Sequence, residues 1–368
     1  MDMIENDDHK EINESEEMSP SENDETVPTT EDSTIELPQK DEDLSIYSNR
    51  GNPELMAFSE KIDEVKKEIA KVIVGQQELI ELMLVALLCG NHVLIEGVPG
   101  IAKTLTAKML AQALSVKFSR VQFTPDLMPS DVIGTNVFNL KSSEFQFKLG
   151  PVFSNVVLID EINRSPAKTQ AALLELMEEK QITVDGKTYQ MDMPFFVIAT
   201  QNPIEQEGTY KLPEAQLDRF IFRIIVDYPG LEDERSILKR FRSDFNQQIK
   251  ADVKPIMTAK DIEKARAVVE SVFIKDELLD YIAQIVVKTR NHGDLYLGAS
   301  PRASIALLKA SKAMAALNGR DFVTPDDIRK VTGPILNHRI IPTPEREMEG
   351  ITSQDIINGI IKNLEVPR

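Results

Sequence analysis

Cysteine and histidine are scarce in this chain of 368 residues, and their scarcity excludes two kinds of structural site. A single cysteine, Cys89, cannot form a disulfide framework, which is typical of proteins from a reducing compartment. Cys89 lies in an apolar run, so we expect a small buried side chain rather than a reactive thiol. The four histidines are scattered and lack the spacing of zinc ligands, so no zinc centre is expected.

Long apolar runs and basic clusters are missing as well. No run of eighteen apolar residues occurs and the N-terminus is acidic, so we expect no transmembrane segment and no signal peptide, and we predict a cytoplasmic protein. The net charge is −18; residues 1–50 hold 17 acidic and three basic residues, a net of −14, which leaves −4 for residues 51–368. Because nucleic-acid binding usually requires a basic face, we expect no nucleic-acid partner.

Residues 1–51 form an acidic N-terminal tail. The tail is rich in Glu, Asp, Ser, Thr and Pro and has few large apolar residues, so it cannot bury enough surface to offset its ordering entropy. We predict that it is disordered. A solubilising role is favoured, although the short apolar segment of residues 44–47 leaves a docking role open.

A glycine-rich segment joins a predicted strand, residues 92–96, to an amphipathic segment that begins at Leu105. Backbone N–H groups in such a turn converge on an anion, and the following helix adds the positive end of its dipole. Lys103 would then reach the β- and γ-phosphates of a nucleotide, and the Thr104 hydroxyl would ligate Mg²⁺. The P-loop pattern has glycine where this chain has Ala102, for which we expect an allowed helical φ/ψ. Nucleotide binding is favoured over an ordinary Gly-Pro turn for the whole segment, Gly97-Val98-Pro99-Gly100-Ile101-Ala102-Lys103-Thr104.

Two acidic residues close a strand that is predicted to be buried on both faces. Four consecutive apolar residues, 156–159, precede Asp160 and Glu161, and the carboxyl ends of strands are where α/β sheets bind ligands. Asp160 would hold the Mg²⁺ shell, and Glu161 would orient and polarise the attacking water. A solvated strand end is the alternative, and the upstream glycine-rich segment favours the catalytic interpretation.

Three weaker signals surround these motifs. Asn202 follows a buried strand, residues 195–199, and is placed to touch a γ-phosphate or the attacking water, although asparagine before proline is also common in turns. Arg302 opens a helix against the helix dipole, which indicates an anion beside it; a solvated surface arginine is equally compatible. A turn between two predicted helices is a candidate for packing the adenine ring, Val74-Gly75-Gln76.

The order of predicted elements divides the rest of the chain in two. Residues 52–230 alternate strands and helices, which predicts an α/β core with a central parallel sheet. Two alternating stretches within it, residues 135–149 and 181–191, predict projecting hairpins, the second around Asp185-Gly186. From residue 231 to residue 368 the pattern is helical, which predicts an all-α domain.

Together these motifs resemble the AAA+ ATPases, and within them the MoxR family, over about residues 53–363. The resemblance implies an α/β P-loop core with a helical lid, the Walker A role for Lys103 and Thr104, and the Walker B role for Asp160 and Glu161. It also assigns Val74, Gly75 and Gln76 to the adenine site. The segments that carry the resemblance are residues 97–104, 160–170, 199–203, 212–220 and 300–303.

The same resemblance implies a ring mechanism. Asn202 resembles sensor 1, Arg219 the arginine finger that reaches the γ-phosphate of a neighbouring subunit, and Arg302 sensor 2, which contacts phosphate from the lid. The family fold implies ATP and Mg²⁺ as ligands and a homo-oligomer, usually a hexamer. The resemblance also implies work on protein clients, often with partners that carry von Willebrand factor A domains, and likens the two hairpins to insertions that usually face the central pore or a client. Alternatives are a magnesium-chelatase-type subunit, an ATP-gated scaffold without turnover and a nucleic-acid motor.

Overall fold

The computed structural model describes residues 53–141, 143–203, 209–210, 212–242 and 253–367. All of them belong to one compact unit, Arg50–Arg368. The predicted acidic tail, residues 1–51, lies outside the described residues.

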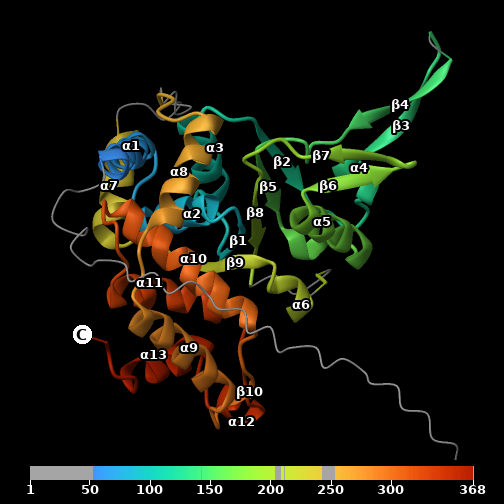
Figure 1. Cartoon of the computed structure of the whole chain (residues 1–368). Helices are drawn as coiled ribbons and strands as arrows, with labels where there is room; N and C mark the ends of the chain where they lie inside the picture. Colours follow the sequence, from blue (N-terminus) through green and yellow to red (C-terminus); the bar gives the residue numbers. More distant parts are fainter. Residues whose placement is uncertain (1–52, 142, 204–208, 211, 243–252, 368) are drawn as a thin grey trace, which may run out of the picture. The chain divides into compact units, whose positions relative to one another are not determined.

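A five-stranded parallel sheet forms the centre of this unit (Figure 1). Its strand order is β2-β5-β8-β1-β9, and each neighbouring pair is parallel. The predicted α/β core with a central parallel sheet is therefore confirmed. Because the strands are parallel, their carboxyl ends share one edge of the sheet and their amino ends share the opposite edge. The strands are β1 (His92–Gly97), β2 (Phe118–Gln122), β5 (Val156–Asp160), β8 (Phe196–Gln201) and β9 (Phe220–Val226).

The helix α2 (Gln77–Leu88) packs against the sheet, and α1 (Pro53–Ala70) packs against α2 and other helices. In α1 the buried residues recur every three or four positions, which gives one apolar face, whereas nine of the twelve residues of α2 are buried. The helix α3 (Lys103–Ala113) follows β1, and α5 (Ala167–Glu179) follows β5. Short helical segments complete this part: α4 (Pro129–Ile133), η2 (Ile162–Arg164) and α6 (Glu214–Leu217).

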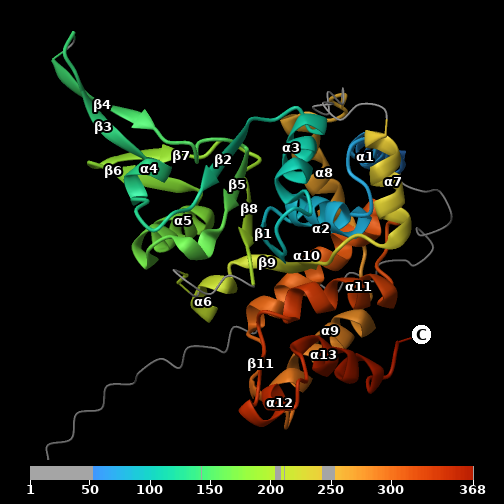
Figure 2. The same cartoon turned by 180° about the vertical axis from the view of Figure 1, so that it is seen from behind.

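Both predicted hairpins are present. The first pairs β3 (Gly134–Asn139) with β4 (Glu144–Leu149), and the second pairs β6 (Gln181–Val184) with β7 (Lys187–Gln190). Asp185 and Gly186 both have positive φ, 49° and 77°, as a tight hairpin turn requires. Figures 1 and 2 show the β3–β4 hairpin extending away from the central sheet.

The described residues after β9 are mainly helical, with one small addition that the sequence did not indicate. An antiparallel pair joins β10 (Leu295–Leu297) to β11 (Ile341–Pro342). The helix that begins at Pro325 continues through Pro334 to Leu336, and its last two residues, Ile335 and Leu336, are buried. The helices are α7 (Leu231–Phe241), α8 (Ala259–Ser271), α9 (Asp276–Arg290), α10 (Pro301–Leu317), α11 (Pro325–Leu336), α12 (Pro344–Met348) and α13 (Ser353–Lys362).

One apolar cluster is shared across the two halves of this unit. It contains side chains from α1, α2 and α3 together with side chains from α8 to α11 and α13. The proposed division at residue 230 stays a prediction. Within the described ranges, no helix combines the length and the apolar character needed to cross a bilayer.

Candidate functional site

The glycine-rich segment lies between β1 and α3, at the carboxyl edge of the sheet. A Cβ atom at Gly97 would lie 2.6 Å from the Val226 carbonyl oxygen, so only glycine fits where β1 passes β9. Gly100 has φ +86°, a left-handed conformation that glycine favours. The first turn of α3 contains no acidic residue, so its positive dipole end faces the loop without a competing carboxylate. This geometry suits an anion.

Ala102 does not have the helical conformation that we expected. Its φ of 60° and ψ of 23° lie in the left-handed region, which glycine adopts more easily than alanine. This explains why the usual P-loop pattern has glycine at this position. An alanine there is disfavoured by about 1 kcal/mol. The Ala102 carbonyl accepts bonds from the Thr106 N–H at 2.9 Å and the Thr106 hydroxyl at 3.0 Å, which hold the turn. Strained backbone of this kind clusters at functional sites.

Lys103 folds back over the loop. Its ammonium group donates to the Gly97 carbonyl oxygen at 2.6 Å, and the residue is half-buried. Burial lowers the pKa of Lys103, while the nearby carboxylates of Asp160, Glu161 and Glu96 act in the opposite direction. A phosphate anion in the loop would therefore stabilise the charged ammonium.

Asp160 and Thr104 meet beside the loop. The Thr104 hydroxyl lies 3.4 Å from Asp160 Oδ2, and the Asp160 carboxylate also accepts bonds from Arg120 Nε at 2.6 Å and the Thr200 hydroxyl at 3.1 Å. A hydroxyl and a carboxylate are the hard oxygen ligands that Mg²⁺ prefers, so the two predicted ligands fit this ion.

Glu161 stands next to this pair in a left-handed conformation, with φ 58°. Its backbone N–H donates to the Thr200 hydroxyl at 3.1 Å. Its carboxylate accepts a hydrogen bond from the Gln122 amide at 2.7 Å and pairs with Arg164 at 2.9 Å. Asn202 is buried at the end of the neighbouring strand β8. The structure thus brings these predicted residues to one edge of the sheet.

Three residues of this edge were missed from the sequence: Arg120, Gln122 and Thr200. Positions 120 and 122 lie on β2, where Gln122 is in register with Asp160 of β5. The only local signal is their alternation on a strand, and the strand order that places them beside Asp160 is a long-range property.

Gln76 contacts the glycine-rich segment and the first turn of α3 through its side-chain amide. Its side-chain amide donates to the Ile101 carbonyl oxygen and accepts from the Thr106 hydroxyl at 3.0 Å. Gly75, with φ +74°, lies against Asp233 of α7, where a Cβ atom would clash, and Val74 precedes it half-buried. Leu105 packs on the main apolar cluster.

Arg219 and Arg302 lie at the other edge of the sheet. Arg219 directly precedes β9, which runs parallel to β1 with Phe220 opposite His92 and Val226 opposite Gly97. The six residues of β1 therefore separate Arg219 from the phosphate loop of its own chain, roughly 20 Å at the rise of a strand. Both arginines pair with Glu178 of α5: Arg219 at 3.1 Å and Arg302 at 2.6 Å.

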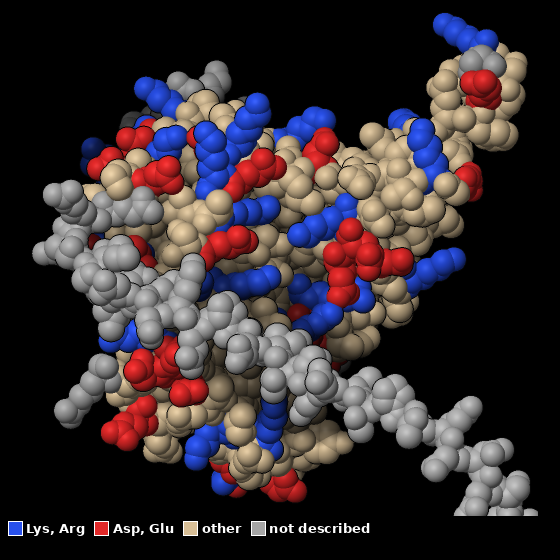
Figure 3. All heavy atoms as spheres, viewed as in Figure 1, with Lys and Arg blue, Asp and Glu red and all other residues tan. Residues whose placement is uncertain are grey.

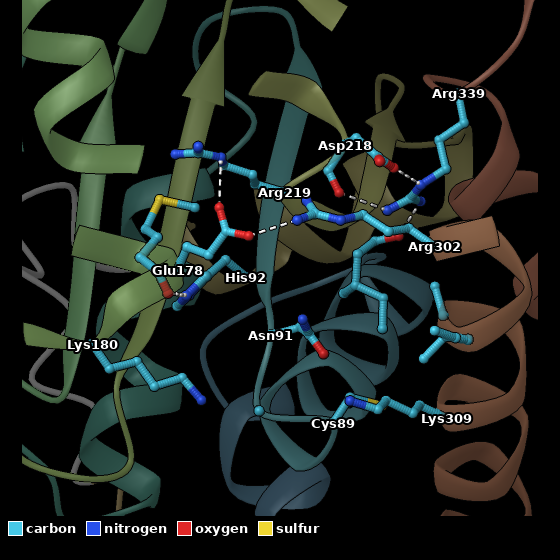
Figure 4. A pocket seen from close by; sticks show the side chains of 15 residues that line it. Cys89, Asn91, His92, Glu178, Lys180, Asp218, Arg219, Arg302, Lys309 and Arg339 are labelled. Atoms are coloured by element: carbon cyan, nitrogen blue, oxygen red, sulfur yellow. Dashed lines mark hydrogen bonds and ion pairs between the residues drawn. The ribbon is translucent and has the colours of Figure 1, made fainter. Parts of the chain in front are cut away.

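A pocket of about 300 Å³ opens beside these arginines (Figure 4). Its described lining residues carry more positive than negative charge, which favours an anionic ligand. Burial lowers the pKa of Lys180, and the positive charges of Arg266 and Lys309 act in the same direction. The cationic residues of the lining are Lys180, Arg219, Arg302, Lys309 and Arg339, and the acidic ones are Glu178 and Asp218.

Comparisons with known proteins agree with this geometry. Residues 92–222 match the model of the ATPase family associated with various cellular activities (AAA), and residues 287–360 match the AAA lid domain. The chain is 45% identical to the uncharacterized protein YeaC of Bacillus subtilis, over 85% of this chain and 98% of that protein. It is 43% identical to the chaperone MoxR1 of Mycobacterium tuberculosis, over 82% of this chain and 81% of that protein.

A solved structure shares the fold as well. The crystal structure of an ATPase candidate from Cytophaga hutchinsonii superimposes with a TM-score of 0.80 and 45% identity, over 86% of this chain and 97% of that one. Sequence identity over most of the length, the two matched models and the shared fold lead to one conclusion. The chain belongs to the MoxR family of AAA+ ATPases.

Proposed function

We propose that the protein hydrolyses ATP in a ring of identical subunits, in which each nucleotide lies between the phosphate loop of one copy and the Arg219 edge of the next. The observation that carries this proposal is the separation of the two sets of residues. Lys103, Asp160 and Glu161 lie at the carboxyl edge of the sheet, whereas Arg219 precedes β9 at the amino edge. A single rigid chain cannot bring both sets to one phosphate, but a head-to-tail neighbour can.

The carboxyl edge supplies binding and the attacking water. Lys103 and the amino end of α3 neutralise the phosphates, while Thr104 and Asp160 hold Mg²⁺. The bound Mg²⁺ would neutralise the charge that develops on the phosphate oxygens. Glu161 polarises the water that attacks the γ-phosphate, and Asn202 helps to orient it.

The amino edge supplies cations to the neighbouring subunit. Arg219 and Arg302 share the carboxylate of Glu178 in the isolated chain, so both are already directed at an anion. The γ-phosphate of a neighbour carries more negative charge than this carboxylate and would compete for both guanidinium groups. An arginine delivered in this way contributes about 10³-fold or more to the hydrolysis rate.

Hydrolysis would drive work on a protein client in the cytoplasm. The ring is a hexamer in this proposal, and proteins with von Willebrand factor A domains are the proposed partners. Support for a client surface comes from the β3–β4 hairpin, where the exposed side chains of Phe138 and Phe145 lie opposite each other and Leu140, just after β3, is exposed as well. Figure 3 shows few charged side chains along this hairpin, while both signs of charge alternate over the rest of the visible face.

Substitution of Glu161 by glutamine tests the catalytic part. Because glutamine keeps the size of the side chain but cannot act as a base, Glu161→Gln should retain ATP binding and lose phosphate release. Glu179→Gln, an exposed acid at the end of α5, is the control and should hydrolyse at the normal rate. Unchanged turnover in Glu161→Gln would reject the assignment, and binding without turnover in the unmodified protein would favour the scaffold alternative.

A further inference from the structure

Arg339, just after α11, is a charged residue in a buried place. Its side chain is 4% exposed, and burial lowers its pKa while the Asp218 carboxylate acts in the opposite direction. The guanidinium donates to Asp218 Oδ1 at 2.6 Å and to backbone carbonyl oxygens around it. These acceptors are Ile335 at 2.6 Å, Phe220 at 2.8 Å, Ile221 at 3.0 Å and Asp218 at 3.2 Å.

The acceptors of these bonds flank Arg219. One guanidinium nitrogen, Nη2, bonds to the carbonyl oxygens of both Asp218 and Phe220, the residues directly before and after Arg219. The Asp218 carboxylate also accepts a bond from the Ser300 hydroxyl at 3.3 Å, at the start of the helix that carries Arg302. Figure 4 shows Arg339 and Asp218 beside the two arginines. The pair therefore ties together the segments that carry both cations.

The residues before Arg339 extend this contact along β9. The Asn337 amide donates to the Arg223 carbonyl oxygen at 3.0 Å, and the His338 ring lies 3.0 Å from the Phe220 carbonyl oxygen. Arg223 in turn pairs at 2.6 Å with Glu96, the residue before Gly97 of the phosphate loop. The end of α11 is thus bonded to β9 from the Arg219 end toward the nucleotide end.

We infer that Arg339 is a positioning residue for Arg219: it fixes the Asp218–Phe220 backbone to the helical region, so that the guanidinium of Arg219 is presented to the neighbouring subunit. This inference rests on the proposed action of Arg219 across the interface. Loss of Arg339 would remove the ion pair of Asp218 and the guanidinium hydrogen bonds to the carbonyl oxygens on both sides of Arg219, so the segment would relax. A displacement of about 1 Å at a reacting group can lower a rate by about 100-fold.

The first test compares Arg339→Met with a matched control, Arg320→Met. Arg320 pairs with Asp327 through two hydrogen bonds of 2.6 and 2.5 Å at the other end of α11, away from Arg219. Both substitutions remove a buried or half-buried ion pair, so both should lower the melting temperature. Only Arg339→Met should lower kcat, by ~10-fold or more, with an unchanged ATP dissociation constant. Equal kcat values in the two variants would overturn the inference.

Arg339→Lys provides a second comparison. A lysine keeps the positive charge beside Asp218 but lacks the planar fork that reaches the carbonyl oxygens, so kcat should fall between the values of the unmodified protein and Arg339→Met. Full activity in Arg339→Lys would show that charge alone suffices and would contradict the positioning role.

Mixed rings separate positioning from general damage. Arg339→Met subunits have an intact phosphate loop, and Glu161→Gln subunits have an intact and correctly positioned Arg219. A mixture of the two should therefore restore hydrolysis at interfaces where Arg219 of a Glu161→Gln subunit meets the phosphate loop of an Arg339→Met subunit. Mixing Arg339→Met with Arg219→Ala should restore nothing, because both lack the same half of the site. Restoration in this second mixture, or its absence in the first, would overturn the inference. The mixture of Glu161→Gln with Arg219→Ala tests the proposed function separately, since it contains no change at Arg339.

Discussion

The two edges of the central sheet differ in the chemistry that they offer. At the carboxyl edge, Asp160 and Glu161 stand beside Lys103 and the amino end of α3, a set suited to a nucleotide and its metal ion. At the amino edge, Arg219 and Arg302 share one carboxylate, Glu178, in a pocket with surplus positive charge.

In the proposed mechanism, this difference makes each edge one half of a phosphoryl-transfer site. The carboxyl edge holds Glu161, the carboxylate proposed to activate water, but not Arg219 or Arg302; the amino edge has these arginines but not the glycine-rich segment. Because β1 and β9 run side by side in fixed register, the halves stay apart in one chain. In the proposed mechanism, assembly of the ring is therefore part of the active site, and the following changes act on one edge at a time.

Removal of the cation at the amino edge should have the largest effect. Arg219→Ala should lower the ATP hydrolysis rate by ~10³-fold with little change in ATP affinity, since the phosphate loop is untouched. Arg235→Ala, an exposed arginine of α7 that pairs with Glu232, is the control. Phosphate release and calorimetric ATP binding measure the two quantities, and a parallel loss of affinity would place Arg219 in its own chain's nucleotide site.

Acid should destabilise the amino edge through His92. Burial lowers the pKa of His92 to about 4, and the ring bonds to the Met177 carbonyl oxygen and the Val197 N–H. Between pH 6.5 and 4 the unfolded chain binds a proton that the native chain does not, so the free energy of unfolding falls as pH falls, by about 3 kcal/mol. The pKa of the buried His338 is lowered too, which acts in the same direction.

Denaturant unfolding of wild type and His92→Phe from about pH 7 to about pH 4.5 measures this dependence. The variant should be less stable at neutral pH, because it loses both hydrogen bonds, and its stability should depend less on pH. Replacement of the partly exposed His292 by glutamine is the control. Curves of equal slope for wild type and His92→Phe would show that His92 does not carry the effect.

A change at the carboxyl edge should have a smaller effect. Ala102→Gly should raise the free energy of unfolding by up to about 1 kcal/mol, because glycine fits the left-handed backbone and the gain exceeds its larger unfolded-state entropy. Ala111→Gly, at a buried helical position in α3, should instead lower stability. A loss of stability or of ATP affinity in Ala102→Gly would contradict the conformation described for this turn.

Neutralising the shared carboxylate should have the smallest effect. Glu178→Gln removes the carboxylate that competes with a neighbour's γ-phosphate for Arg219 and Arg302. The rate of ATP hydrolysis, measured at a protein concentration that limits ring assembly, should therefore rise by about two- to fivefold. The gain is small because Glu178 is 40% exposed and its pairs are screened by water. Glu175→Gln, an exposed acid on the same helix, should leave the rate unchanged. A lower rate in Glu178→Gln would mean that this carboxylate orients the arginines and does not compete for them.

Local patterns predicted much of this architecture. The buried strand before Asp160, the Asp185-Gly186 turn and the glycine-rich segment each depend on neighbours in the sequence, so their periodicity and turn chemistry were sufficient. The left-handed conformation of Ala102 was not predicted, because an alanine in a sequence does not indicate a positive φ, whereas a glycine often does.

The sequence did not predict which residues the site residues contact. Arg120 reaches Asp160 across 40 positions, Arg339 reaches Asp218 across 121, and Glu178 joins Arg302 across 124. Each contact depends on strand order and on the packing of α10 and α11 against the core, neither of which a local pattern encodes. The sequence analysis identified Arg219 and Arg302 as candidate site residues, but it did not identify Glu178, the carboxylate with which both pair.

A mixture of two inactive variants shows whether ATP is hydrolysed between two subunits. Glu161→Gln lacks the proposed catalytic carboxylate and Arg219→Ala lacks the proposed activating cation, so neither should hydrolyse ATP alone. In a random one-to-one mixture about a quarter of the interfaces join the intact phosphate loop of an Arg219→Ala subunit to the intact Arg219 of a Glu161→Gln subunit. This mixture should recover about a quarter of the wild-type rate of ATP hydrolysis. Phosphate release no greater than that of the separate variants would contradict hydrolysis between two subunits.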